Sequence, residues 1–350
     1  MTAIELVTIM LTLIAAAIAM VLVTVLVSSL VQAHRLRLEP LQVVAREAIA
    51  NALSGRELKA NETLNSLSRF SERCIVTVVL DLAPSVSGTS RLMLHALGDE
   101  TGVLERARRG LNRRRWSTRL YSARVLTAFG VESNDLCGLL ADRSPEVRAQ
   151  AAAWVVVTPS EPAIHCLIEL LNDPDGLCRF AAKDALIRIG LASSDALIRA
   201  LGTADEELTK SVLEVAAAIG DERFYEPSIG LIVSSSPDTR ALAAAVLART
   251  GSPDAGAALV ALLDDPCPEV VMAATAGVGK LGFWPGAVDI EPLLNHESWD
   301  LRKRAALTLL SLGAPGAVLL RATAPGEGPA AQIAGQALQL HSLPTRSEAA

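Results

Sequence analysis

The sequence predicts an all-α protein, in which a solenoid of about eight helical hairpins follows one transmembrane helix. Glycines recur at intervals of 30 or 31 residues, and each follows a helical run rich in Ala and Leu. A fixed period in this range is typical of solenoids, in which each unit packs on its neighbours. The chain also contains 26 consecutive uncharged residues, from Leu6 to Val31. The recurring glycines are Gly190, Gly220, Gly251, Gly282 and Gly313, with Gly130 two intervals upstream.

The uncharged stretch, residues 6–31, is predicted to anchor the chain in a membrane. A helix of this length reaches about 39 Å, which is enough to cross a hydrocarbon core of about 30 Å. A cleaved signal peptide is the alternative, because Val31-Gln32-Ala33 resembles a cleavage site, although no Lys or Arg precedes the stretch. The basic residues that flank the stretch all follow it: His34, Arg35, Arg37 and Arg46. The positive-inside rule therefore predicts a single-pass inner-membrane protein with cytoplasmic repeats.

Composition agrees with a helical protein in a reducing compartment. Hydrophobic residues make up 51% of the chain but aromatic residues only 3%, and the excess is Ala, Leu and Val. The five cysteines are scattered, without a C-x-x-C pair, so we expect them to be unpaired. Residues 34–130 contain 16 Lys and Arg against 9 Asp and Glu, whereas residues 131–350 contain 16 against 28. The first part of the chain after the anchor is therefore basic, and the rest is acidic.

Four segments are expected along the chain. Residues 1–33 contain the anchor, residues 34–84 form a membrane-proximal helical segment, residues 85–343 form the solenoid, and residues 344–350 form a disordered tail. The run Cys74–Leu80 is rich in β-branched residues, which favour a strand. A single strand among helices would have no partner, so a helix is predicted here.

A recurring joint marks the repeats between residues 100 and 340. In Leu139-Leu140-Ala141-Asp142-Arg143-Ser144-Pro145-Glu146-Val147-Arg148, the Leu pair ends a first helix, and Ser-Pro opens the second. An apolar position and an Ala pair then bury the second helix, and a glycine ends it in a left-handed cap. The apolar position recurs as Val147, Leu177, Leu208, Thr239, Val270 and Leu301.

This joint, with its A-A-x-x-L run and closing L-G, resembles the short bacterial HEAT repeats related to those of phycobilisome lyases. The resemblance covers about three quarters of the chain and implies that acidic and basic residues of the joint form ladders between neighbouring units. The implied acids are Asp142, Asp173 and Asp265, and the implied bases are Arg119, Arg148, Arg179, Lys210, Arg240 and Arg302. Ala204 and Ser235 replace the acid in two units, so the ladder is expected to be interrupted there.

The densest local feature is an arginine-rich hairpin. It contains Arg106, Arg108, Arg109, Arg113, Arg114, Arg115 and Arg119, with Trp116 in its turn. Three interpretations are open: a solvated basic turn, a contact with anionic headgroups of the inner leaflet, and a contact with an acidic partner protein. Nucleic acid is not expected as a partner, because the whole chain is acidic and interleaved aromatic residues are missing.

The sequence indicates binding rather than catalysis. No Ser/His/Asp or Cys/His arrangement and no set of metal ligands is evident, so no enzyme activity, metal or cofactor is expected. Trp284 and Trp299 would serve as interface anchors if exposed, but buried packing is preferred for them. The main hypothesis is a membrane-anchored scaffold that docks a partner protein on a concave surface of second helices. The alternative, implied by the family resemblance, is a lyase or lyase chaperone acting on a tetrapyrrole.

Overall fold

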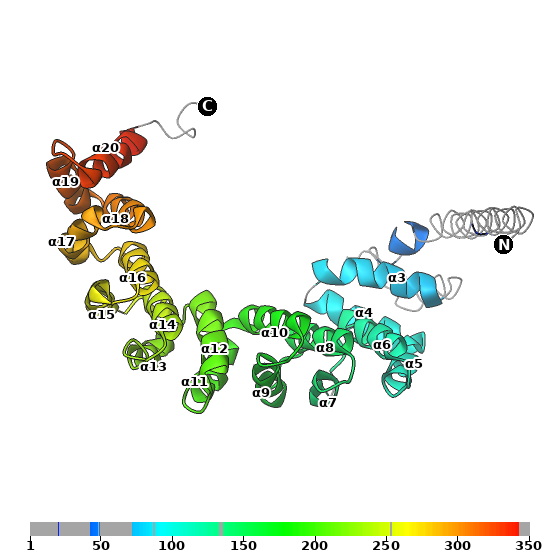
Figure 1. Ribbon diagram of the computed structural model, residues 1–350. Helices are drawn as coiled ribbons and strands as arrows, with labels where there is room; N and C mark the ends of the chain where they lie inside the picture. Colours follow the sequence, from blue (N-terminus) through cyan, green and yellow to red (C-terminus); the bar gives the residue numbers. More distant parts are fainter. Residues whose placement is uncertain are drawn as a thin grey trace, which may run out of the picture. The chain divides into compact units, whose positions relative to one another are not determined.

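The computed structural model describes residues 20, 43–47, 49, 72–86, 88–132, 136–252 and 254–342, and the chain divides into two compact units, residues 1–133 and 134–350. The described parts are helical and contain no strand (Figure 1). Apart from Met20, the predicted anchor lies outside the described residues, and so does the predicted tail. No helix among the described residues is both long enough and apolar enough to cross a bilayer.

Four α-helices of the first unit have described bounds, and residues 43–47 are also helical. The four helices are α3 (Glu72–Leu82), α4 (Thr89–Glu100), α5 (Val103–Leu111) and α6 (Trp116–Ala128), with a short 3₁₀ turn η1 (Ala83–Ser85) after α3. The β-branched run lies inside α3, where Val76 and Val79 are buried, which confirms the predicted helix. Gly110 allows α5 to approach α6 closely, because a Cβ atom at this position would lie 2.0 Å from Ser122 Oγ.

The second unit is a stack of seven helical pairs. Its first helices are α7 (Leu136–Leu140), α9 (Glu161–Leu170), α11 (Ser194–Leu201), α13 (Tyr225–Ile229), α15 (Ala255–Ala261), α17 (Ala287–Ile290) and α19 (Ala314–Thr323). Its second helices are α8 (Pro145–Val157), α10 (Gly176–Ile189), α12 (Glu206–Ile219), α14 (Pro237–Thr250), α16 (Pro268–Leu281), α18 (Trp299–Ser311) and α20 (Pro329–Ser342). Short 3₁₀ segments extend several first helices: η2 (Gly190–Ser193), η3 (Glu222–Phe224), η4 (Leu262–Asp264), η5 (Trp284–Gly286) and η6 (Glu291–Asn295).

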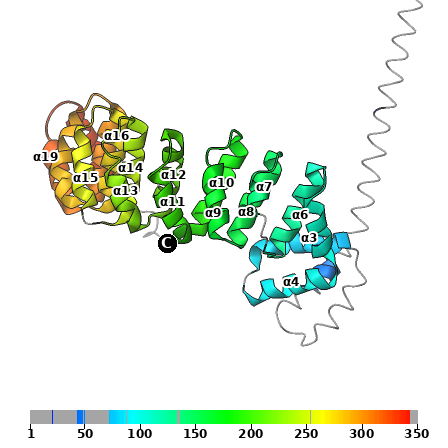
Figure 2. The same ribbon diagram turned by 90° about the horizontal axis from the view of Figure 1, so that it is seen from below.

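The two sets of helices lie on opposite sides of this unit (Figures 1 and 2). Together with the α5–α6 pair of the first unit, the described residues contain eight helical hairpins, as the repeat period predicts. Buried residues form a continuous hydrophobic core across neighbouring pairs, for example from Ala244 through Ala274 and Ala305 to Ala337. Each pair therefore stabilises the next by burying its apolar face.

The second helices begin as the sequence predicts. Pro145, Pro237 and Pro268 occupy first turns, where their missing N–H groups cost nothing. Two of the six predicted apolar positions are not buried, because Leu208 is half-buried and Leu177 is 51% exposed. Asp175 caps α10 by accepting a hydrogen bond from the N–H of Leu177. The third helical residue, which points into the core, is therefore Cys178.

The predicted glycines end their helices with positive φ angles between 65° and 73°. Gly220, Gly251 and Gly282 adopt the left-handed helical conformation. Gly190 and Gly313 combine positive φ with ψ near −135° instead. That region of backbone conformation is open essentially to glycine alone, so the glycines are needed in both forms of the cap.

Candidate functional site

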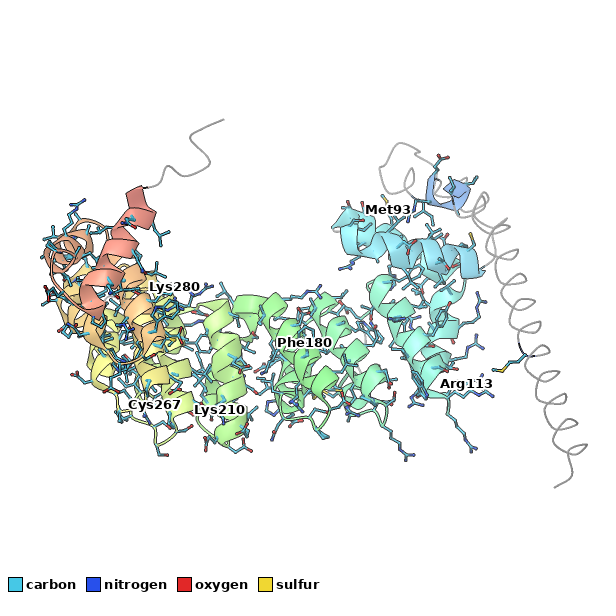
Figure 3. All side chains as sticks on the ribbon, turned by 45° about the horizontal axis from the view of Figure 1, so that its top comes forward. Met93, Arg113, Phe180, Lys210, Cys267 and Lys280 are labelled. Carbon is cyan, nitrogen blue, oxygen red and sulfur yellow. A yellow bond between two sulfur atoms is a disulfide. The ribbon has the colours of Figure 1, made fainter. Side chains whose placement is uncertain are left out.

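The arginine-rich hairpin consists of α5, the turn of residues 112–115 and α6. Its turn is exposed and contains Arg113 (Figure 3). Trp116, the first residue of α6, is 48% exposed. No described residue forms an ion pair with Arg113, Arg114 or Arg115. The three turn arginines are thus available to a charged ligand.

The other arginines of the hairpin have local contacts. Arg108 lies 3.6 Å from Asp99, and Arg109 lies 3.4 Å from Glu105. Arg106 donates to the carbonyl oxygen of Thr101 at 3.1 Å. Both ion pairs are about half exposed or more, so each contributes only about 0–1 kcal/mol. The structure brings the predicted basic residues together, and the ion pairs of Arg108 and Arg109 are exposed to solvent.

The implied ladder is present at two joints of the second unit. Arg148 Nη2 donates to Asp173 Oδ1 over 2.8 Å. Arg240 binds Asp265 through two hydrogen bonds, from Nε to Oδ2 at 2.7 Å and from Nη2 to Oδ1 at 2.8 Å. The four side chains are at most 14% exposed. The hydrogen bond from Arg240 holds the pKa of Asp265 below its ordinary value.

Ladder arginines also hold the loops of their own repeats. Each donates through Nη1 to the carbonyl oxygen six residues upstream, at 2.7–3.0 Å: Arg119, Arg148, Arg179, Arg240 and Arg302. In the same loops, a side chain accepts a hydrogen bond from the backbone N–H two residues downstream, at 2.8–3.0 Å. The acceptors are Asp142, Asp173, Asp265 and His296, whose Nδ1 takes the place of a carboxylate oxygen. The ladder residues are therefore structural elements of the repeat.

The ladder is interrupted on both sides of α12, as the replacements at Ala204 and Ser235 predict. Among the described residues, Arg179 donates only to carbonyl oxygens of its own loop. Lys210 pairs with Glu207 at 2.6 Å and lies 3.8 Å from Asp238. The partner carboxylates of Lys210 are largely exposed, so α12 is joined to α14 by weaker contacts than those at the buried rungs.

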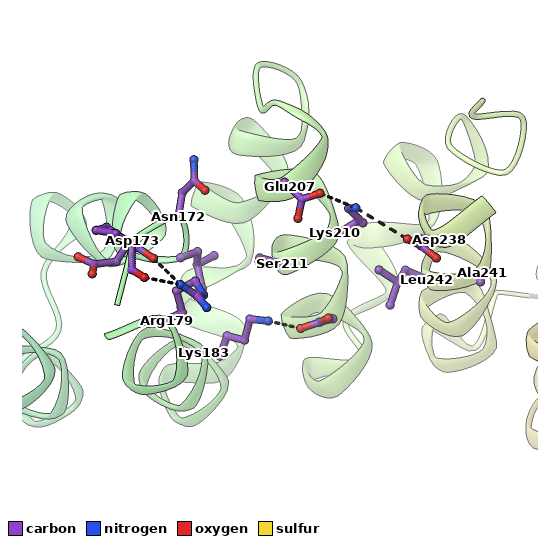
Figure 4. Close-up of a pocket in the computed structure, with 13 residues that line it drawn as sticks. Asn172, Asp173, Arg179, Lys183, Glu207, Lys210, Ser211, Asp238, Ala241 and Leu242 are labelled. Carbon is purple, nitrogen blue, oxygen red and sulfur yellow. Dashed lines mark hydrogen bonds and ion pairs between the residues drawn. The ribbon is translucent and has the colours of Figure 1, made fainter. Parts of the chain in front are cut away.

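A groove of about 730 Å³ lies at this interruption and crosses α10, α12 and α14 (Figure 4). Its charged lining residues carry both signs: Arg179, Lys183 and Lys210, with Asp173, Glu207, Glu214 and Asp238. Lys183 and Glu214 pair across it. Phe180 follows Arg179 on α10, and its side chain is 70% exposed (Figure 3). The groove thus combines a mixed-charge lining with an exposed aromatic ring nearby.

A second set of contacts, which the sequence did not suggest, connects first helices. Arg223 donates to Asp195 Oδ1 at 2.6 Å, to the Leu191 carbonyl oxygen at 3.1 Å and to both carboxylate oxygens of Asp221. The hydrogen bond from Arg223 lowers the pKa of Asp221 to about 2. Arg223 lies two residues after Asp221 in the sequence, which was the available signal.

The expectation of unpaired cysteines is wrong for two of the five. Cys137 in α7 and Cys166 in α9 form a disulfide, with their Cα atoms 5.8 Å apart. The pair lies about one repeat apart in the sequence, on first helices that stack side by side, which was the missed signal. Cys74 and Cys178 are buried, and burial raises the pKa of both thiols. Cys267 donates to Glu269 Oε2 at 2.8 Å.

The expectation of buried tryptophans is also wrong at two positions. Trp284 in η5 is 62% exposed, and Trp299 at the start of α18 is 53% exposed. Lys303 lies over the Trp299 ring, 4.9 Å from its centroid. Both rings therefore meet the condition under which they would serve as interface anchors.

The sequence matches the family model for HEAT repeats over residues 133–218 and 228–290. These two segments are similar to HEAT repeats. No curated protein matches the chain by sequence. Among solved structures, an engineered protein is 18% identical, with a TM-score of 0.36, and the match covers 86% of this chain and 95% of that one.

Two natural proteins also resemble the chain. The complex of CpcE and CpcF of phycocyanin lyase from Nostoc sp. PCC7120 is 21% identical, with a TM-score of 0.33 and coverage of 68% of this chain and 94% of that one. Importin beta is 13% identical, with a TM-score of 0.47 and coverage of 76% of this chain and 44% of its own. At these identities, the likeness concerns the helical-repeat fold and nothing about function follows.

Proposed function

We propose that this protein is a membrane-anchored scaffold whose HEAT repeats dock a partner protein near the inner leaflet, without an enzymatic activity of its own. Arrays of HEAT repeats present extended surfaces of second helices, and such surfaces typically bind other proteins. The observation that carries the proposal is the groove across α10, α12 and α14. It spans three consecutive repeats, so a single ligand in it would contact all three.

The groove has the properties of a protein-binding surface. Its charged residues of both signs favour a partner that presents complementary charges, because electrostatic complementarity selects partners and steers association. Phe180 supplies an exposed aromatic side chain of the kind that forms the centre of interfaces. We expect the partner to cover Phe180 and to pair with Lys183 or Lys210.

Site-specific crosslinking tests this docking surface. A photoreactive amino acid would be placed at Phe180, on the second-helix side, or at the exposed His165 on α9 as the matched control. The proposal predicts one discrete adduct from position 180, lost on Lys210→Glu, and no such adduct from position 165. Equal crosslinking from both positions, or an adduct from position 180 that Lys210→Glu leaves unchanged, would contradict it.

The proposed membrane attachment rests on residues 6–31, which contain no charged side chain. The basic residues Arg35, Arg37 and Arg46 that follow this stretch support a cytoplasmic location of the repeats. The full-length protein should remain in the membrane fraction after alkaline carbonate extraction. A variant that lacks residues 6–31 should be released from that fraction. If the deleted protein stays in the membrane fraction, this stretch is not the anchor.

The cysteine pair tests the proposed sidedness. The geometry of Cys137 and Cys166 permits a disulfide, and the compartment decides whether it forms, because cytoplasmic reductants keep thiols reduced. After acid trapping of cells, the cytoplasmic location predicts that both thiols react with a maleimide without prior reduction. Reaction only after treatment with dithiothreitol would place the repeats on the opposite side of the membrane.

A further inference from the structure

The first unit contains a cavity of about 390 Å³ at the arginine-rich hairpin. It lies where α5 meets α6, with Val76 of α3 among the residues that line it. Three arginines line it: Arg106, Arg109 and Arg113. Arg106 and Arg109 lie three residues apart on one face of α5, and Arg113 lies in the turn that follows the helix.

The remaining polar lining consists of hydroxyl groups. Thr118, Tyr121 and Ser122 of α6 contribute them, and no Asp or Glu lines the cavity. Ser122 is buried and faces Gly110, while Tyr121 is 47% exposed. Three guanidinium groups and three hydroxyl groups thus line the cavity, without a carboxylate that would repel an anion.

The surrounding charge favours an anion as well. Residues 103–128 contain eight arginines and one acid, Glu105. Glu105 contacts Arg109 at 3.4 Å, but both side chains are more than 60% exposed, so this pair is weak and screened by salt. An excess of positive charge of this kind raises the local concentration of anions around the cavity.

We propose that this cavity binds a phosphate group, carried either by the headgroup of an anionic lipid or by a soluble phosphate ester. Planar guanidinium groups match phosphate oxygens through paired, charge-assisted hydrogen bonds, and hydroxyl groups complete such a shell. The inference deepens the membrane contact proposed above, and it rests on that proposal only for the lipid source of the phosphate.

In a built site, only the arginines that line the cavity contribute to binding, whereas in a diffuse basic patch every arginine contributes. Arg113 and Arg114 are neighbours in the same exposed turn, and no described residue pairs with either, but only Arg113 lines the cavity. Arg113→Gln and Arg114→Gln therefore form a matched pair. Each variant removes one positive charge, and neither breaks a described ion pair. A diffuse patch predicts the same loss from both variants, whereas the cavity predicts a loss from Arg113→Gln alone.

The experiment uses the full chain in nanodiscs of phosphatidylcholine. Inorganic phosphate and glycerol 3-phosphate are titrated by calorimetry, and discs containing phosphatidylglycerol are compared by hydrogen exchange at α5. We expect one phosphate per chain, weakened about tenfold or more by Arg113→Gln and less than about twofold by Arg114→Gln. Protection of α5 by phosphatidylglycerol that Arg113→Gln removes assigns the phosphate to a headgroup, and calorimetric binding without that protection assigns it to a soluble ester.

Two results overturn the inference: the absence of binding in both arms, or an equal loss from the two variants. Neither result bears on the docking surface, because the crosslinking test at Phe180 involves another part of the chain. Circular dichroism of Arg113→Gln confirms that a loss of binding does not come from unfolding.

Discussion

Replacing Arg240 by Ala tests the reasoning on the ladder. This side chain satisfies Asp265 with two hydrogen bonds in a site where the two residues are 12% and 7% exposed. In Arg240→Ala, the carboxylate of Asp265 would keep only the N–H of Cys267 among its described hydrogen bonds. Removal of one partner from a buried ion pair costs about 3–5 kcal/mol, because it leaves an uncompensated charge.

Arg302 provides the matched control. It makes the same contacts with its own loop, donating to the carbonyl oxygens of His296 at 2.7 Å and Glu297 at 2.9 Å. No described carboxylate pairs with Arg302. Arg302→Ala therefore loses only hydrogen bonds to neutral carbonyl oxygens, which should cost about 1–2 kcal/mol of stability. The expected difference between the two variants is about 2 kcal/mol, which corresponds to about 30-fold in an opening equilibrium.

Native-state hydrogen exchange is the appropriate assay, because repeats open locally and a single unfolding midpoint would average over them. Amides of α14 and α16 should lose about 30-fold more protection in Arg240→Ala than those of α18 lose in Arg302→Ala. Adding Asp265→Asn to Arg240→Ala should recover part of the loss, because the buried charge is gone. Equal losses in the two single variants, or no recovery in the double variant, would refute the reasoning.

Three further predictions concern stability. The pKa of Asp221 falls from 3.8 to about 2 on folding, so its carboxylate contributes about 2 kcal/mol to the free energy of unfolding above pH 4. This contribution is lost as the pH falls from 4 through 2. The difference in melting temperature between wild type and Asp221→Asn should therefore disappear over that range. Gly256→Ala should cost about 1–3 kcal/mol in thermal unfolding, because a Cβ atom would lie 2.3 Å from the Phe283 ring, and Phe283→Leu should relieve part of this cost. Reduction of the oxidised protein should cost about 3.5 kcal/mol for a closed loop of 29 residues, and a variant with serine at Cys137 and Cys166 should not respond to reductant.

Features that depend on local periodicity could be predicted from the sequence. The glycine caps and the proline-led second helices follow from backbone preferences of single residues, and the repeat amplifies that signal. The ladder followed from resemblance, and the structure contains two of its rungs, Arg148–Asp173 and Arg240–Asp265. The same reasoning misplaced Leu177, because the apolar leucine was chosen 30 residues after Val147, whereas the residue 31 positions after Val147, Cys178, points into the core.

Features that depend on pairing between helices were less accessible. The disulfide joins Cys137 and Cys166 on neighbouring first helices, and their separation of about one repeat indicates a pair only once those helices are known to stack. The contacts of Arg223 likewise connect separate first helices. The arginine-rich hairpin was visible in the sequence, but the separation of its arginines into those that line a cavity and those that do not required the packing of α6 against α5.

The interrupted ladder gives the second unit an uneven stiffness. Buried guanidinium–carboxylate rungs resist shear, whereas the solvated pairs around α12 weaken as ionic strength rises. Bending should therefore concentrate at α12. A ligand bound in the groove across α10, α12 and α14 would restrict this bending. The free and occupied forms should then differ mainly in the angle between α10 and α14.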